Sequence, residues 1–425
     1  MKFNHSILGD IASVGDGAHS KVKRVEDGVL YLTSKNIKKG FLDLEKVDYI
    51  SNEDYTKLFS KSTNSVRHLE KNDILVGIIG TFGNIYQYSD GDYFGISSSI
   101  GIIRANKEII NPNFLYYYLS SRYVERYIEN IKGGSVQGYT NLSALRSIPI
   151  KYPENIAYQS KIVHIMSSLD SKIELNNQMI DTLEEMASTL FKRWFVDFEF
   201  PDENGNPYKS SGGKMIDSEL GEIPEGWKVD IFGAKMSFIS KGTTPTKKDL
   251  SLHNTEEMVS FLKVKDMPMK GLIKYNILEK IPKIVHETKL KRSILKKGDV
   301  LLSIAGTIGR VNIVTENISL NTNQAVSFIR FFQNKNVYYY MVLLKSDIYQ
   351  QKLKEKIVHA VQPNLSLSEI KSLKIISPPE VLIDSFLKII SPIYFQIIKL
   401  DKEANELEEI RDTLLPKLLS GEIEV

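Results

Sequence analysis

The chain repeats itself once over most of its length. The segment Leu69–Leu75 and the glycine run Gly80–Gly83 return as Leu295–Leu301 and Gly306–Gly309, at an offset of 226 residues. Solenoid repeats have periods of roughly 20–50 residues, so an offset this long indicates one duplicated domain together with the segment that follows it. A duplicated binding domain implies a duplicated target.

Length and composition exclude several classes of protein. A chain of 425 residues is long enough for two to three domains, and 42% hydrophobic with 25% charged residues is typical of a globular protein. The absence of cysteine excludes a disulfide scaffold, a thiolate zinc site and a cysteine nucleophile. The segment Met1–His5 leads into no signal peptide, and no apolar run approaches the ~18 residues of a membrane span. We therefore expect a soluble, cytoplasmic protein.

Net charge alternates in step with the duplication. Residues 1–153 carry 19 Lys and Arg against 16 Asp and Glu, and residues 227–379 carry 25 against 12. The intervening residues 154–226 carry 6 against 14, and residues 380–425 carry 5 against 10. Basic domains suit a polyanion such as DNA, and acidic connectors would be repelled from it. The alternative is an ordinary lysine-rich surface.

The acidic segments show a periodicity of 3.5 residues, because their apolar positions alternate in steps of 4 and 3. This spacing is typical of a coiled coil, in which a single buried asparagine fixes the register. The first predicted seam comprises Ile162, Met166, Leu169, Ile173, Asn176, Ile180, Leu183, Ala187, Leu190 and Trp194. The second comprises Phe386, Ile390, Ile393, Ile397, Leu400, Ala404 and Leu407, with Pro392 tolerated or producing a kink.

We expect one helix from about Tyr158 to Asp197, paired antiparallel with its later copy. Such pairing would place the two domains at opposite ends, related by a pseudo-two-fold axis. The alternative is two independent amphipathic helices, each packed on its own domain.

The expected fold class is α+β. Two similar mixed domains with β-rich cores, at residues 1–153 and 227–379, are each followed by a coiled-coil helix, at 154–200 and 380–425, and residues 201–226 form a turn-rich linker. Short β-branched runs at 73–79 and 299–304 predict strands, and 114–131 and 338–357 predict helices. The tyrosines of these helices could stack on bases, but their helical spacing favours packing within their own domain.

Signs of catalysis are nearly absent from the sequence. No histidine pair has metal-ligand spacing and no Walker-type phosphate loop occurs, while the glycines from Gly77 to Gly83 fit a tight hairpin better than a phosphate cradle. The segment Asn111–Phe114 resembles the motif of adenine amino-methyltransferases but lacks its second proline. Asp266 with Glu287 and Lys289 fits a nuclease pattern only loosely. We expect no catalytic residue, cofactor or metal in this chain.

Several motifs occur together in one order along the duplicated frame. These are Leu-Gly-Glu-Ile-Pro-Glu-Gly-Trp at 220–227, the paired Gly-Thr-x-Gly loops, Asn-Leu-Ser before a short strand, and Leu-Leu-x-x-Leu-Leu-Ser-Gly-Glu-Ile at 414–423. Over essentially its whole length the chain resembles the specificity subunit of type I restriction-modification systems. One departure is Phe3, which stands at the position equivalent to Trp227 and should keep its packing role.

The resemblance implies a subunit without catalytic activity. Each target recognition domain would read one half of a split, asymmetric DNA sequence, and the helical pair would set the unspecific gap between the halves. The helices would also recruit two modification (methyltransferase) subunits, and the assembly would bind restriction (translocase and endonuclease) subunits. S-adenosylmethionine, ATP and Mg would then belong to those partners. The methyltransferases would flip their target adenines out of the stack.

Residues that touch DNA should be polar or basic and lie on loops that differ between the halves but occupy matching places. In the first half the candidates are His19, Ser20, Lys21, Lys35, Asn36, Thr81, Asn84, Gln137, Tyr139 and Thr140. In the second half they are Thr243, Thr244, Thr246, Lys247, Lys248, Lys265, Thr307, Arg310 and Gln362. Arg310 is favoured for a base edge or a phosphate, whereas Arg104 and Arg330, shared by both halves, suit a structural or phosphate role.

Two other classes of function remain open at this point. One is an interaction scaffold in which the coiled coil joins two protein-binding domains, which would show no salt-dependent affinity for DNA. The other is a methyltransferase or nuclease that acts alone, which would show turnover with DNA, cofactor and magnesium.

Overall fold

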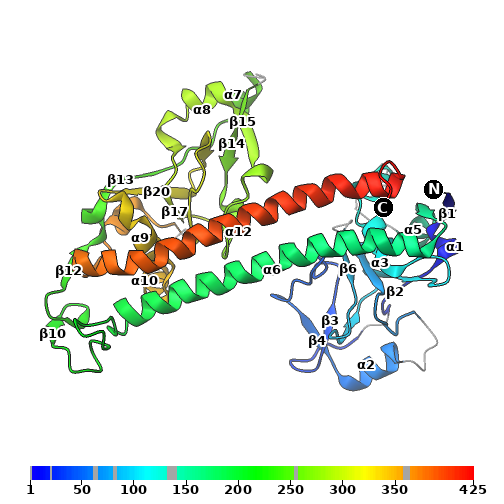
Figure 1. Cartoon of the computed structure of the whole chain (residues 1–425), viewed down its shortest axis with the longest axis horizontal. Helices are drawn as coiled ribbons and strands as arrows, with labels where there is room; N and C mark the ends of the chain where they lie inside the picture. Colours follow the sequence, from blue (N-terminus) through cyan, green and yellow to red (C-terminus); the bar gives the residue numbers. More distant parts are fainter. Residues whose placement is uncertain are drawn as a thin grey trace. The chain divides into compact units, whose positions relative to one another are not determined.

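The computed structural model describes residues 2–19, 22–60, 66–79, 84–131, 141–252, 257–357 and 364–425 (Figure 1). The chain divides into two compact units. Unit 1 comprises Met1–Ser171 and Leu407–Val425, and unit 2 comprises Lys172–Glu406. Two long helices, α6 (Ile156–Phe195) and α12 (Glu380–Ser420), contribute residues to both units.

The remaining elements of unit 1 are, in chain order, β1 (Phe3–Ile7), α1 (Leu8–Ile11), β2 (Ala12–Asp16), β3 (Val29–Leu32), β4 (Asp48–Ile50), α2 (Asn52–Phe59), β5 (Ile74–Gly77), β6 (Ile85–Gln87), β7 (Phe94–Ile96), β8 (Ile100–Ala105), α3 (Pro112–Leu119), α4 (Arg122–Ile131), α5 (Leu142–Arg146) and β9 (Pro149–Pro153).

Those of unit 2 are β10 (Met215–Ser218), β11 (Gly221–Pro224), β12 (Lys228–Ile231), β13 (Met236–Lys241), α7 (Lys247–Leu252), β14 (Met258–Leu262), β15 (Glu279–Pro282), α8 (Lys283–Glu287), β16 (Ile294–Leu295), β17 (Val300–Ser303), β18 (Val311–Ile313), β19 (Leu320–Thr322), β20 (Val326–Phe331), α9 (Val337–Lys345), α10 (Asp347–Ile357), α11 (Leu367–Lys371) and β21 (Lys374–Ser377). Single 3-10 turns lie at Phe232–Lys235, Val264–Asp266, Tyr275–Ile277, Lys291–Ser293 and Asn334–Asn336.

The four-stranded sheet with the long central pair has the same strand order in both units, and the second sheet of unit 2 has one further strand, β16. In unit 1 the sheets have the orders β2-β8-β5-β6 and β4-β3-β7, and in unit 2 the orders β13-β20-β17-β18 and β15-β14-β19-β16. A two-stranded ribbon, β1-β9 or β12-β21, completes each unit. All of these pairs are antiparallel except β3-β7 and β14-β19, which are parallel. The expected α+β repeat is confirmed at the level of strand order.

The four-stranded sheet that ends in β6 or β18 separates two cores in each unit. Alternating side chains of a strand point to opposite faces, so along β5 Ile74 and Val76 join the core under the helices while Leu75 joins the core against the second sheet. Strand β17 repeats the pattern, with Val300 and Leu302 on the helix side and Leu301 on the other. Both sheets carry the loops considered below.

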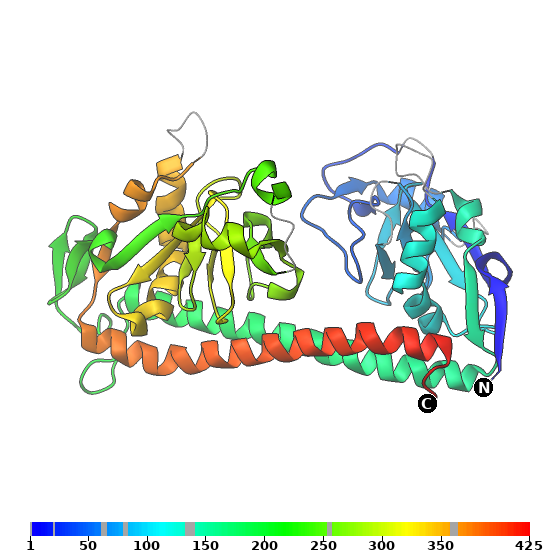
Figure 2. The same ribbon diagram turned by 90° about the horizontal axis from the view of Figure 1, so that it is seen from above.

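The long helices pack side by side within each unit and run antiparallel. In unit 2 Phe191 contacts Phe386 and Asn176 bonds to Glu403, and in unit 1 Asp170 pairs with Arg411 (Figure 2). The side chains predicted for the two seams are buried or partly buried throughout. The helices also pack on the domains, since Phe195 and Phe386 both contact Tyr339 of α9.

Helix α12 is long and apolar enough, by length and composition alone, to cross a membrane. Its apolar stripe, which includes Phe386, Ile390 and Ile397, is instead buried in the core of unit 2. A packed amphipathic helix accounts for this composition. Pro392 lies within the helix without ending it.

Three local expectations differ from the structure. The helices predicted at 114–131 and 338–357 are each two helices, broken after Leu119 and after Lys345. The segment 201–226 is not only a linker, because β10 and β11 form an antiparallel hairpin there. The segment Asn111–Phe114 is a helix cap, in which Asn111 Oδ1 accepts hydrogen bonds from the two N–H groups after Pro112.

Candidate nucleic-acid interface

The first loop predicted to contact DNA follows β2. Two backbone hydrogen bonds hold its start, and we call this pair of bonds the clamp. Gly17 N–H donates to Ile100 O and Ala18 N–H donates to Ile96 O, at 3.1 and 2.9 Å. A Cβ atom on Gly17 would lie 2.3 Å from Ile96 O, so only glycine fits. Beyond the clamp the ring of His19 stands at the surface, 63% exposed, with Nε2 2.7 Å from an oxygen of Asp16.

The same clamp recurs in unit 2. Gly242 N–H donates to Val326 O and Thr243 N–H donates to Thr322 O, each at 3.0 Å. A Cβ atom on Gly242 would lie 2.2 Å from Thr322 O. The next residue, Thr244, is exposed and bonds to Gln324. In both halves the residue two positions after the clamped glycine, His19 or Thr244, therefore lies at the same place in the fold.

Four loops meet beside the clamp of unit 1. Ser34 donates from Oγ to Ile79 O at 2.7 Å and from N to Ser99 Oγ at 3.0 Å, which joins the loops after β3, after β5 and before β8. Asn84 Nδ2 donates to Ile37 O, which ties in the start of β6. The predicted loops thus come from separate parts of the sequence to one edge of the domain.

In unit 2 Arg310 joins two of the loops. Its Nη1 donates to Val264 O at 3.2 Å and to Met267 O at 2.7 Å, so the turn after β17 is tied to the loop after β14. Ser303 closes that turn, because its Oγ donates to Thr307 O and accepts from Arg310 N–H. The guanidinium of Arg310 is therefore engaged with backbone carbonyls, and contact with DNA stays a prediction for this residue.

The candidates differ in how freely they face solvent. His19, Lys35, Thr244, Thr246, Lys247, Lys248, Lys265 and Thr307 are exposed, and Asn84 and Thr243 are half-buried. Asn36 is buried, and its amide holds the loop after β3 by donating to Asp43 O and Lys46 O. Ser20, Lys21, Thr81, Gln137, Tyr139, Thr140 and Gln362 lie outside the described residues.

Several exposed or partly exposed residues at these loops were missed from the sequence. Arg67 Nε donates to Asp16 O beside His19, and Gln324 bonds to Thr244, although both come from distant segments. Lys289, which lies close to Asp249 of α7, and the following Lys291 and Arg292 were also missed. Their excess of positive charge was the available signal.

The arginines shared by both halves have a structural role. Arg104 donates from Nε and Nη2 to the two carboxylate oxygens of Asp73, at 2.8 and 2.6 Å. The hydrogen bonds to Asp73 raise the pKa of Arg104 above its usual value. Arg330 and Asp299 repeat the pair. These side chains hold the strands in place.

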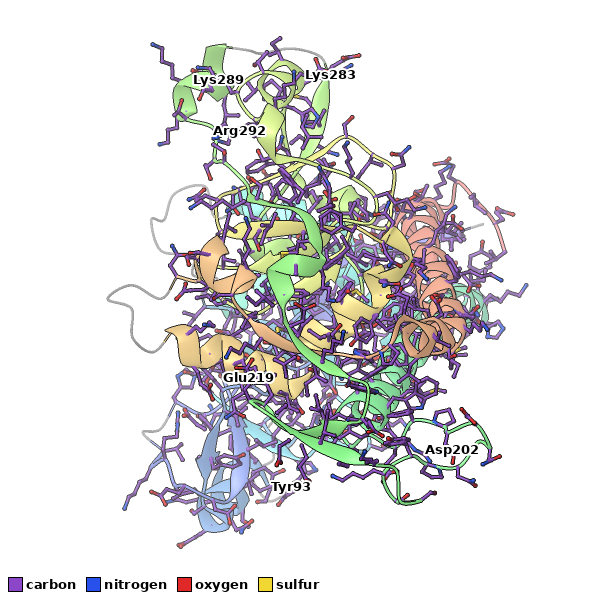
Figure 3. The ribbon with its side chains drawn as sticks, turned by 90° about the vertical axis from the view of Figure 1, so that its left-hand side faces the viewer. Tyr93, Asp202, Glu219, Lys283, Lys289 and Arg292 are labelled. Atoms are coloured by element: carbon purple, nitrogen blue, oxygen red, sulfur yellow. The ribbon has the colours of Figure 1, made fainter. Side chains whose placement is uncertain are left out.

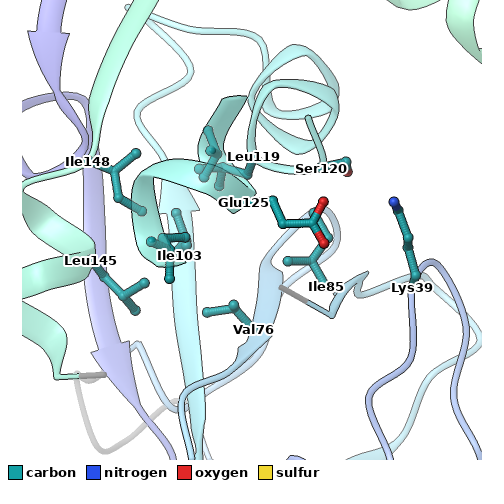
Figure 4. A pocket seen from close by; sticks show the side chains of 11 residues that line it. Lys39, Val76, Ile85, Ile103, Leu119, Ser120, Glu125, Leu145 and Ile148 are labelled. Carbon is teal, nitrogen blue, oxygen red and sulfur yellow. The ribbon is translucent and has the colours of Figure 1, made fainter. Parts of the chain in front are cut away.

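Among the described residues no group of three His, Asp or Glu side chains is close enough to hold a metal ion. A cavity of about 20 Å³ lies in unit 1 between β5 and α4, lined mainly by aliphatic side chains with Lys39 and Glu125 (Figure 4). It has room for about one water molecule, far less than an adenine ring needs.

The two β-rich domains repeat one frame, and each brings unlike polar loops together on it. The family model of the type I restriction modification DNA specificity domain matches the chain twice, at residues 8–185 and 224–409. The chain belongs to this family. It is a specificity subunit, whose role is not catalytic.

Curated relatives match most of the chain. The type I restriction enzyme MjaIX specificity subunit of Methanocaldococcus jannaschii is 29% identical, over 75% of this chain and 71% of its own. The HindI specificity subunit of Haemophilus influenzae is 26% identical, over 84% and 87%. A solved S subunit of a type I restriction-modification system from M. genitalium is similar in fold, with a TM-score of 0.54 over 98% of this chain and 96% of that one, at 16% identity.

Proposed function

We propose that each of the two domains reads one half of a bipartite, asymmetric DNA sequence. The observation that carries this proposal is the repeated glycine clamp with different residues beyond it. Beyond the clamp one domain has His19, which pairs with Asp16, and the other has Thr244, which bonds to Gln324, on otherwise matching backbones. Base edges are discriminated by the donors and acceptors of side chains, so unlike side chains at matching positions suit unlike half-sites.

The helices α6 and α12 set the gap between the half-sites and recruit two modification (methyltransferase) subunits, and the complex also takes up restriction subunits. The exposed apolar side chains Leu175, Met179 and Met186 on α6, and Phe395 on α12, support a role in subunit contact. S-adenosylmethionine, ATP and magnesium would be held by these partners. We place the complex in the cytoplasm, where it meets DNA.

Methylome sequencing of the host with and without this gene tests the proposal. We expect loss of adenine methylation at one motif made of two specified halves and an unspecified gap. Exchange of residues 1–153 for those of a relative should change only one half of the motif. Loss at a contiguous motif, or at none, would reject the proposal.

Two alternatives predict other results. A scaffold without DNA affinity would leave the methylome unchanged, and its complexes would not respond to salt in a DNA-binding assay. An enzyme acting alone would methylate or cut DNA as the purified chain with cofactor and magnesium.

A further inference from the structure

Five exposed cations of unit 2 form a surface that we call the basic ridge: Lys247, Lys248, Lys289, Lys291 and Arg292. Two segments carry it, α7 and the 3-10 turn after α8. They are adjacent because Lys289 Nζ lies 4.0 Å from Asp249 Oδ1 of α7. In Figure 3 Lys289 and Arg292 lie together at one end of the domain, near Lys283.

The basic ridge continues the candidate nucleic-acid interface. Thr246 caps α7, since its Oγ1 accepts from Asp249 N–H at 3.1 Å and its own N–H donates to Asp249 Oδ2 at 3.0 Å. Asp249 thus connects the loop after the Gly242 clamp with Lys289.

Most of the ridge charge is available to a ligand. Within the described part of the chain Lys247, Lys248, Lys291 and Arg292 make no salt bridge. Two lysines after β14 differ, because Glu279 pairs with Lys263 and Lys265, at 2.5 and 2.8 Å. Four cations without a salt bridge thus lie on two adjacent segments.

Among the described residues, the first domain differs from the second at the two matching places. After β4, where unit 2 has α8 and the turn at 291–293, unit 1 has α2, which carries Glu53 and Asp54 against Lys57. Before β3, where unit 2 has α7, Arg24 is paired with Asp48 at 2.7 Å. The excess of basic residues in 227–379 over 1–153 is thus partly concentrated at one place in the fold.

We propose that the basic ridge binds the sugar-phosphate backbone of duplex DNA next to the second half-site, so that the second domain supplies the larger share of sequence-independent affinity. This inference rests on the proposed function, since it needs DNA at the interface of unit 2. Lysine and arginine on a phosphate backbone release condensed counterions without reading sequence. The second domain would then bind the backbone of DNA of any sequence, while both domains recognise the bases.

The test compares two charge-matched variants in the complex with its methyltransferase partners. The ridge variant carries Lys247→Gln, Lys248→Gln, Lys291→Gln and Arg292→Gln. The control variant removes four exposed cations elsewhere in unit 2 and carries Lys209→Gln, Lys228→Gln, Lys354→Gln and Lys371→Gln. Affinity for the target duplex and for an unrelated duplex is measured from about 50 to 200 mM salt, where each phosphate contact contributes about 0.9 to the slope of log K against log salt.

We expect the ridge variant to lower the salt slope by about 3–4 on both duplexes, and the control variant by less than about 1. The methylated motif should be unchanged, and Lys↔Arg exchanges at the four ridge positions should keep the slope of the wild type. Two double variants should each lower the salt slope by about 2: Lys247→Gln with Lys248→Gln, and Lys291→Gln with Arg292→Gln.

An unchanged slope in the ridge variant would overturn the inference. A changed base preference in the second half of the motif would also overturn it, because the ridge would then read bases. Failure of the proposed function looks different, since the wild-type complex itself would show neither a bipartite motif nor salt-dependent binding.

Discussion

Arg330 donates two parallel hydrogen bonds to the buried carboxylate of Asp299, from Nε to Oδ1 at 2.6 Å and from Nη2 to Oδ2 at 2.8 Å. Asp299 is 2% exposed and its Oδ2 also accepts from Lys296 N–H, so one carboxylate fixes the turn before β17 and the strand β20. Arg104 and Asp73 form the same pair in unit 1. The frame of each domain depends on this contact.

Asp299→Ala should destabilise unit 2 by about 3–5 kcal/mol, because it leaves the guanidinium of Arg330 without its partner. The urea midpoint of tryptophan fluorescence measures this, since both tryptophans, Trp194 and Trp227, lie in the core of unit 2. The double variant Asp299→Leu with Arg330→Leu should lose less. Asp73→Ala, in unit 1, is the matched control and should leave this midpoint in place. A loss below about 1 kcal/mol for Asp299→Ala would contradict the assignment.

Asn176→Leu should stabilise the helix pair. Asn176 is fully buried in the seam, where Nδ2 donates to Glu403 at 3.1 Å while Oδ1 has no partner among the described residues. A buried acceptor without a partner costs about 1–3 kcal/mol, so an apolar side chain there should raise the free energy of unfolding. The same fluorescence midpoint checks it, and Leu175→Asn, at an exposed neighbour, is the control. A lower midpoint for Asn176→Leu would show that the bond to Glu403 outweighs the unpaired oxygen.

Gly242→Ala should impair reading by the second domain. The added Cβ would lie 2.2 Å from two carbonyl oxygens, of Thr322 and Asn323, so the clamp must open, at a cost of about 1–3 kcal/mol. We expect methylation at the bipartite motif to fall at least about tenfold, since 1.4 kcal/mol is a factor of ten.

Gly17→Ala should have the same effect through the first domain. Gly91→Ala is the control, because nothing lies within 4 Å of its Cβ position. Full methylation in the Gly242→Ala complex would show that the clamp does not position the reading loop.

His286 should make the stability of unit 2 depend on pH. Burial lowers the pKa of His286 below its usual 6.5; the charge of Glu287 opposes this shift, and the smaller effect of Lys283 adds to it. Its Nδ1 accepts from Asn321 Nδ2 at 3.1 Å, and a protonated ring would lose that bond. The unfolded chain binds a proton at His286 more readily than the folded chain does. The contribution of neutral His286 to the free energy of unfolding is therefore complete above pH 6.5, and it is lost as the pH falls from 6.5 through the pKa of the folded state.

The urea midpoint between about pH 5 and 8 measures this dependence. His286→Gln keeps an acceptor toward Asn321 and should flatten the profile. An equally steep profile in His286→Gln would assign the effect to other groups.

The repeat and the helices were the most predictable parts of the structure. The seam spacing predicted a helix from about Tyr158 to Asp197, and α6 spans Ile156–Phe195. A period of 3.5 residues can be read from a single stretch of sequence, without knowledge of the residues that pack against it. The parallel pairs β3-β7 and β14-β19 had no such signal, since they join segments about sixty residues apart that only the folded core brings together.

The individual site residues were less predictable than the loops that carry them. The loops did converge, but the amide of Asn36 and the guanidinium of Arg310 turn inward to backbone carbonyls. Composition alone does not tell whether a polar side chain on a loop stabilises that loop or contacts a ligand. The packing of the folded domain decides between the two roles. The pairing of Arg104 with Asp73 was accessible, because both residues recur at the same offset of 226.

The glycine clamps have a consequence for how such proteins diversify. Each clamp is built from main-chain N–H and C=O groups, so every residue beyond it can be exchanged without loss of an anchoring bond. Mutation can therefore explore new side chains at positions such as His19 or Thr244 while the fold is inherited unchanged. A host lineage could acquire a new self-recognition mark through a few codons, and each half could do so independently of the other.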